Sequence, residues 1–144
     1  DWPIQILVTH DFSDQSANAV RVADAWASAL DAELTVLHVI EPVVYPELYA
    51  LNVVPDDVMT RLRDRATEAL DQSAREILGS RPRNTSVLIG PAADTIVGEA
   101  EAPSIDLVIM GSRGLSGFKQ FVLGSVADSV LRRCPEPLLT VSGV

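Results

Sequence analysis

The chain has 144 residues, of which 47% are apolar and 5% aromatic, and its 20 acidic against 11 basic residues give a formal net charge of −9. This length favours one domain over residues 1–144, with enough apolar residues for a core. The negative charge disfavours nucleic acid and anionic membranes, and no apolar run approaches the ~20 residues that span a bilayer. No secretory leader is visible, and the single cysteine excludes an internal disulfide. We therefore expect a soluble cytoplasmic protein.

Short runs rich in Val, Ile and Leu predict five β-strands, over residues 4–9, 33–40, 85–89, 105–110 and 137–141. Polar and apolar residues alternate only weakly in them, which is typical of strands buried on both faces. The segments between the strands have helical periodicity. Strand and helix therefore alternate, which predicts an α/β fold with a parallel sheet, right-handed crossovers and helices on both faces.

Four helices are predicted between these strands. Ser13 or Asp14 can cap the first, which runs to Leu30. Pro55 and two acids open the second, and Gly79 ends it. Two shorter helices are predicted over 92–102 and 125–133. The second helix has an apolar stripe of Val58, Leu62, Ala66, Ala69, Leu70 and Ile77, and its arginines 61, 63 and 65 are expected in solvent.

Residues 40–55 form the one connection without a clear period. They are apolar and include three prolines and both tyrosines. They could form a lid over a ligand, a partner surface, or a packed segment on the second helix. We favour packing or a dimer contact over a lid.

The segment between Asp106 and Asp128 contains no carboxylate, although the chain is acidic, and it is rich in glycine. Gly111 would let backbone approach a ligand, and Gly114 would permit a positive φ and direct N–H groups inward. Gly124 and Ser125 stand at the start of the last helix, whose free N–H groups can bind a phosphate. The Ser125 hydroxyl could cap that helix, donate to a phosphate or contact a bound Mg²⁺, while Arg113 and Lys119 add positive charge. Phosphate binding and an ordinary loop explain the local pattern equally well. The segment is neither a Walker A loop nor a Rossmann fingerprint.

The end of the first strand, Thr9-His10-Asp11, would face the same crevice if the first and fourth strands are neighbours. Asp11 can cap the first helix, which is a common role for an Asp that follows a strand. His10 is interpreted as a hydrogen-bonded structural residue and His38 as a packed one. Cys134 is expected to be a buried, inert thiol, and no metal-ligand spacing is present.

The spacing Gly111-x2-Gly114-x9-Gly124-Ser125 resembles the nucleotide-binding signature of the universal stress protein family. ILVTHDFSDQS, LTVLHVIEP, VLIGPAADTIV and DLVIMGSRGLSG agree with it, as does GSVADSVLRRCPEPLLTV, so the resemblance spans essentially the whole chain. It implies a flavodoxin-like, doubly wound sheet of strand order 3-2-1-4-5. It also implies a homodimer in which the last strands of two copies pair with each other. In this chain the last predicted strand is residues 137–141, from Pro137 to Val141.

The resemblance is to the family's ATP-binding branch, and it implies roles for individual residues. Asp11 would contact the adenosine part, where its carboxylate can accept hydrogen bonds from ribose hydroxyls or an adenine amine, and on this resemblance we favour that role over capping the first helix. The Val39 backbone would bond adenine. Thr9, beside the base pocket, stands where many ATP-binding members have proline. Met110 and Gly111 would flank the base and the ribose. The phosphates would be surrounded by Gly114, Gly124, Ser125 and Val126, with Ser112 and Arg113 in the loop between these two groups. The implied ligand is ATP, or AMP or ADP, with Mg²⁺ or Mn²⁺ arriving on the phosphates.

The function expected from this resemblance is nucleotide-dependent regulation in stress adaptation. One alternative is a slow Mg²⁺-dependent ATPase or phosphotransferase, although no convincing base can be assigned. The other is a dimeric interaction module that binds no nucleotide.

Overall fold

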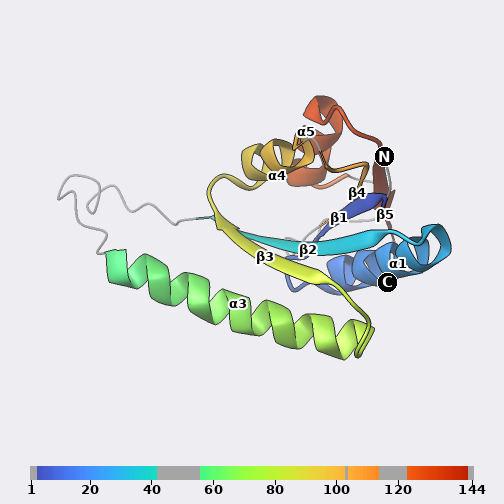
Figure 1. Ribbon diagram of the computed structural model, residues 1–144. Helices are drawn as coiled ribbons and strands as arrows, with labels where there is room; N and C mark the ends of the chain where they lie inside the picture. The colour runs from blue at the N-terminus through green and yellow to red at the C-terminus, as the bar shows by residue number, and fades with distance from the viewer. Residues whose placement is uncertain (1–2, 42–55, 103, 114–122, 143–144) are drawn as a thin grey trace.

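A computed structural model of the chain describes residues 3–41, 56–102, 104–113 and 123–142. Five strands form one parallel sheet in the order β3-β2-β1-β4-β5 (Figure 1). The strands are β1 (Gln5–Thr9), β2 (Glu33–Ile40), β3 (Asn84–Ile89), β4 (Leu107–Gly111) and β5 (Leu138–Val141). This confirms the predicted flavodoxin-like strand order 3-2-1-4-5.

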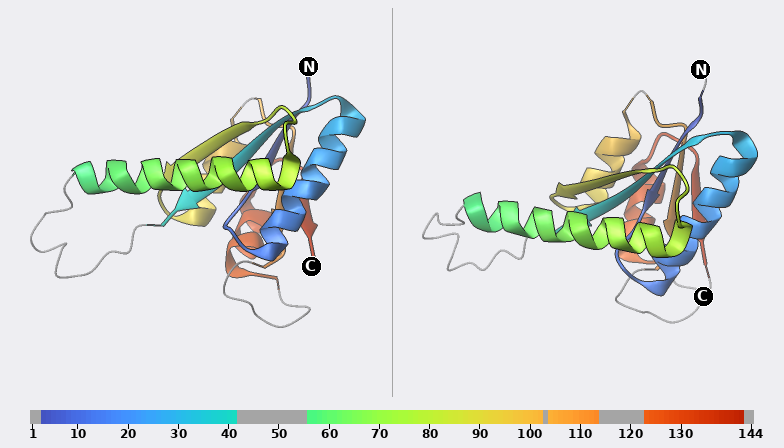
Figure 2. Two further views of the ribbon diagram at one scale, coloured as in Figure 1. Left: turned by 90° about the horizontal axis from the view of Figure 1, so that it is seen from below. Right: turned by 60° about the horizontal axis from the view of Figure 1, so that its bottom comes forward.

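Helices cover both faces of the sheet, as predicted. α1 (Asp14–Leu30) and α3 (Asp56–Leu78) lie on one face, and α4 (Ala92–Ala100) and α5 (Ser125–Arg133) lie on the other (Figures 1 and 2). α4 ends two residues earlier than predicted, because the Ala102 N–H turns back to the Glu99 carbonyl at 3.2 Å. No helix in the described part of the chain is long and apolar enough to cross a membrane.

The core has two halves, one on each face of the sheet. Ile6 and Val8 of β1 are buried in the half that packs on α1 and α3, whereas Leu7 is buried in the half that packs on α4 and α5. Alternate residues of a strand point to opposite faces, so the buried residues 6–8 of β1 must all be apolar. This explains why the strand runs lack polar alternation.

The ends of α1 and α3 follow from local chemistry. The Ser13 side chain accepts the Ser16 N–H at 3.1 Å and caps α1, while Asp31 ends that helix in the left-handed region with φ 51°. Gly79 follows α3 with φ 64°, and its N–H donates to the Arg75 carbonyl at 2.8 Å. Glycine adopts this conformation without a steric penalty, so Gly79 ends α3 as predicted.

The predicted apolar stripe of α3 is buried only toward the C-terminal end of the helix. Leu70 is fully buried, but Val58 and Leu62 are 41% and 45% exposed. The 23 residues of α3 span about 35 Å at 1.5 Å per residue, whereas the six residues of β3 span about 20 Å. The helix therefore extends beyond the sheet (Figure 1), and its first turns have no sheet to cover.

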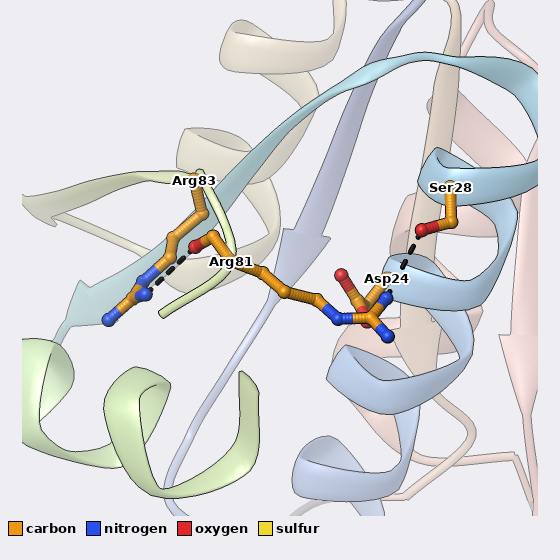
Figure 3. A network of polar contacts seen from close by, with 4 residues as sticks. All are labelled: Asp24, Ser28, Arg81 and Arg83. Carbon is orange, nitrogen blue, oxygen red and sulfur yellow. Dashed lines mark hydrogen bonds and ion pairs between the residues drawn. The ribbon is translucent and has the colours of Figure 1, made fainter. Parts of the chain in front are cut away.

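The turn between α3 and β3 is tied to α1 by Arg81 (Figure 3). Its Nη1 donates to Asp24 Oδ2 at 2.8 Å and to Ser28 Oγ at 3.1 Å, and Arg83 Nη1 donates to the Arg81 carbonyl at 2.9 Å. These contacts are exposed, and such ion pairs contribute less than about 1 kcal/mol. The predicted exposure of arginines 61, 63 and 65 on α3 is confirmed.

Candidate functional site

A cavity opens at the carboxyl ends of β1, β2 and β4, where the strand order reverses between β1 and β4. This is where open parallel sheets bind ligands. Nine residues predicted from the sequence line it: Thr9, Asp11, Val39, Met110, Gly111, Arg113, Gly124, Ser125 and Val126. Of the other predicted residues, Ser112 lies next to the cavity lining, and Gly114 lies outside the described residues.

Seven further residues line the cavity that were not predicted as site residues: His10, Ser16, Leu37, His38, Ala92, Ile96 and Ala127. Most come from the ends of β2, α4 and α5 that converge on the same opening. Among the described residues, no group of three or more His, Cys, Asp or Glu side chains is placed to hold a metal ion.

Val39 presents backbone groups to the cavity. The Glu33 N–H donates to the Ile4 carbonyl, and the His10 N–H donates to the Leu37 carbonyl, both at 2.8 Å. Odd-numbered residues of β2 therefore direct their N–H and C=O toward β1. β1 ends at Thr9, opposite Leu37, so the N–H and C=O of Val39 extend past the last pair of that ladder.

The turn after β1 is held by hydrogen bonds between side chains and backbone. Asp11 Oδ1 accepts the Ser13 N–H at 3.0 Å, and the Asp11 N–H donates to Ser16 Oγ at 3.2 Å. The intervening Phe12 has φ 67°, an unusual value for a bulky residue. Ser13 rather than Asp11 is the N-cap, so the capping role considered for Asp11 is wrong; Asp11 instead fixes the turn that precedes the cap.

His10 is buried at 4% exposure and bonded to Ser16, whose Oγ lies 2.8 Å from His10 Nδ1. Burial lowers the pKa of His10 below its usual 6.5; the neighbouring Asp11 charge opposes this shift and His38 adds to it. Ser16 Oγ also accepts the Asp11 N–H at 3.2 Å and lies 3.1 Å from Ser13 Oγ and 3.0 Å from the Ser13 carbonyl oxygen. Ser16 therefore joins the His10 ring to the turn that begins α1.

His38 is half-buried, and its hydrogen-bond partner fixes its tautomer. Its Nδ1 lies 2.8 Å from the His10 carbonyl, which can only accept, so Nδ1 bears the hydrogen. The Phe12 ring packs beside both imidazoles, with centroids 5.1 Å from His10 and 4.7 Å from His38. The structural interpretation of both histidines agrees with these contacts. Cys134 is half-buried against the core rather than fully buried as expected.

The His10 environment predicts a specific pH dependence of stability. The pKa of His10 is lower in the folded protein than its unfolded value near 6.5, so below pH 6.5 the unfolded chain binds the proton first. The free energy of unfolding should then fall as the pH drops through this window and stay high above it. We expect His10→Gln, which keeps an acceptor for Ser16, to remove this component. Urea unfolding of both proteins at pH 5.5 and 7.5 measures it; equal pH dependence would contradict it.

Ser112 and Gly124, which stand on either side of residues 113–123 in the sequence, lie next to each other. The Gly124 N–H donates to the Ser112 carbonyl at 2.6 Å, and the Ser112 N–H donates to the Val141 carbonyl at 2.9 Å. The start of α5 is therefore fixed next to the end of β4. Gly124 occupies the N-cap position and makes no side-chain cap, so Ser125 is the first helical residue and does not cap α5. The first N–H groups of α5 have no partner within the helix.

The start of α4 also reaches the cavity, but it carries a carboxylate. The Ala92 N–H donates to Glu41 Oε1 at 2.8 Å. The N-termini of α4 and α5 therefore differ. The N-terminus of α4 is bonded by the Glu41 carboxylate, whereas the first three residues of α5 line the cavity. Glu41 was not predicted from the sequence, because it lies 51 residues before Ala92.

Comparison with known proteins agrees with this doubly wound α/β fold. Residues 5–142 match the sequence model of the universal stress protein family. The chain is 34% identical over 136 residues to a Thermus aquaticus protein described as a universal stress protein in the QAH/OAS sulfhydrylase 3′ region, covering 94% of this chain and 96% of that protein. The chain belongs to the universal stress protein family.

Two solved structures are informative. The chain is similar to MJ0577 of Methanocaldococcus jannaschii, with a TM-score of 0.80 and 25% identity over 98% of this chain and 96% of that one. It is also similar to a universal stress protein solved in complex with cAMP, with a TM-score of 0.64 and 26% identity over 96% of this chain and 95% of that one. That relative, which shares this fold and family, therefore binds an adenine nucleotide.

Proposed function

We propose that this chain binds adenine nucleotides, ATP above all, and acts as a regulatory factor in stress adaptation. The observation that carries the proposal is the polarity of the cavity. One end presents the Val39 backbone and the Asp11 carboxylate, and the other presents the N-terminus of α5. This arrangement suits a ligand with a neutral base at one end and phosphates at the other.

The base end fits adenine. An N–H donor and a C=O acceptor on one residue, Val39, complement a ring nitrogen and an exocyclic amine, which adenine presents side by side. Asp11 is an acceptor for ribose hydroxyls, although one of its oxygens also holds the Ser13 N–H. The solved cAMP complex of a family member supports this assignment to adenine.

The phosphate end fits an anion. The first N–H groups of α5, at Ser125 and Val126, lie at the positive end of the helix dipole, and Arg113 also lines the cavity. No carboxylate occurs between Asp106 and Asp128. Glu41 makes the α4 end unfavourable for phosphate. A Mg²⁺ or Mn²⁺ ion would be held by the phosphates, within reach of the Ser125 hydroxyl.

Thermal unfolding tests this function, using protein stripped of copurified nucleotide, with and without ATP, AMP and Mg²⁺. A ligand at about 100 times its Kd stabilises by about 2.7 kcal/mol, which shifts the Tm of a domain of this size by several degrees. We expect a shift with ATP that exceeds the shift with AMP. No shift with any nucleotide, in a folded protein, would overturn the proposal and favour the nucleotide-independent interaction module.

We also propose a homodimer that pairs β5 of two copies. β5 is an edge strand of the sheet, and all four of its residues are half-buried. An edge strand has backbone groups directed away from the sheet that can pair with a second chain.

We also propose a cytoplasmic location, because unpaired cysteines are typical of proteins in a reducing compartment.

A further inference from the structure

Gln15 is a buried polar residue that joins the first turn of α1 to the end of β4. It is 9% exposed, and its Oε1 accepts the Arg113 N–H at 3.0 Å. The same oxygen accepts the Ser112 hydroxyl in a longer contact of 3.5 Å. Gln15 does not line the cavity, so it acts on the site through the backbone that it holds.

The backbone after β4 packs closely on α1. A Cβ at Gly111 would be in van der Waals contact with Gln15, 3.4 Å from its carbonyl carbon and 3.5 Å from its Cβ. The backbone of residues 111–113 thus lies against α1, and the Gln15 amide oxygen bonds its last residue. Because the Ser112 carbonyl accepts the Gly124 N–H at 2.6 Å, the position of Ser112 also sets where α5 begins.

We propose that Gln15 is a positioning residue that aligns the phosphate end of the cavity and thereby sets the preference for phosphorylated over unphosphorylated nucleosides. This inference rests on the proposed function. Its physical basis is one continuous set of contacts: Gln15 holds Ser112 and Arg113, and Ser112 holds Gly124 at the start of α5. The base end depends on Val39 and Asp11, whereas the Gln15 amide oxygen bonds the residues that follow β4.

A purely structural role predicts something different. If Gln15 only fills space, a residue of similar volume should replace it without a selective effect on ligands. Methionine has the same unbranched shape and lacks the acceptor, so Gln15→Met leaves the Arg113 N–H without its partner. Gln72→Met is the matched control, because Gln72 is exposed on α3 and bonds only Glu76, at 3.2 Å, through its side chain.

The test measures Kd for ATP and for adenosine by calorimetric titration of the unchanged chain and both variants. For Gln15→Met we expect ATP affinity to fall about tenfold, equivalent to about 1.4 kcal/mol, and adenosine affinity to change less than about twofold. Gln72→Met should bind both ligands as the unchanged chain does.

Amide hydrogen exchange supplies a readout that does not need a ligand. The Arg113 N–H should lose protection selectively in Gln15→Met and keep it in Gln15→Glu, whose carboxylate is also an acceptor. Equal ATP-to-adenosine affinity ratios in Gln15→Met and the unchanged chain would overturn the inference alone. Parallel loss of both affinities, or a uniform loss of protection, would show a structural role and overturn it too. Absence of nucleotide binding by the unchanged chain would overturn the proposed function as well.

Discussion

Gly111→Val is expected to weaken nucleotide binding strongly while the protein remains folded. Gly111 is buried, and a Cβ there would approach the Arg113 carbonyl oxygen to 3.2 Å and the Gln15 carbonyl carbon to 3.4 Å. Valine adds two methyl groups to that Cβ, so the backbone after β4 must move. Overpacking of this kind costs about 1–3 kcal/mol of stability. The displaced Ser112 would take the start of α5 with it, and we expect ATP affinity to fall about 100-fold or more, or about 2.7 kcal/mol.

Calorimetric titration with ATP and urea unfolding measure the two effects of this substitution separately. Gly98→Val is the matched control, because a Cβ at Gly98 in the middle of α4 would meet nothing within 4 Å. It should bind ATP normally, and its stability should be unchanged or slightly higher, since valine has a better helix propensity than glycine. Unchanged ATP affinity in Gly111→Val would contradict the assignment of the β4 end to the phosphate site.

The fold was predictable because local pattern and topology agree. Every predicted strand and helix is present, since buried parallel strands are apolar throughout and the helices between them carry clear start and stop residues such as Gly79. The positions of Asp11 and Gly111 beside one cavity also followed, once the strand order was inferred. How far along α3 the apolar stripe is buried could not be predicted from the sequence, because periodicity shows which face of a helix is apolar but not where the sheet beneath it ends.

The contacts that organise the site were harder to predict. Gln15 is an ordinary polar residue in the first turn of a helix, and its acceptor role depends on a backbone N–H 98 residues away. Glu41 could be linked to α4 only once β2 and α4 were placed. At the start of α1, Asp11, Ser13 and Asp14 all have the chemistry of a cap, and the geometry of the turn selects Ser13. The role of Gly114 remains a prediction.

Thr140→Pro is expected to convert the proposed dimer into a folded monomer. The Val108 N–H donates to the Pro137 carbonyl and the Ser112 N–H to the Val141 carbonyl, both at 2.9 Å. In a parallel ladder these bonds direct the backbone groups of residues 139 and 141 of β5, and of residue 137 just before it, toward β4, and those of residues 138 and 140 toward the open edge. Proline at 140 therefore removes an outward N–H that a second copy would need and keeps the ladder to β4. Light scattering after size exclusion measures the mass.

Leu139→Pro is the opposing variant, because it removes an N–H that faces β4. Proline at this position removes a hydrogen bond of the ladder to β4, so this variant should lower the free energy of unfolding more than Thr140→Pro does. The pair separates loss of the interface from loss of the fold at adjacent positions of the same strand. A Thr140→Pro protein that keeps the dimer mass would exclude backbone pairing through β5, and a monomeric unchanged chain would exclude the dimer itself. If the dimer is lost while ATP binding persists, the nucleotide site belongs to the single chain, as the cavity lined by β1, β2, β4, α4 and α5 of one copy requires.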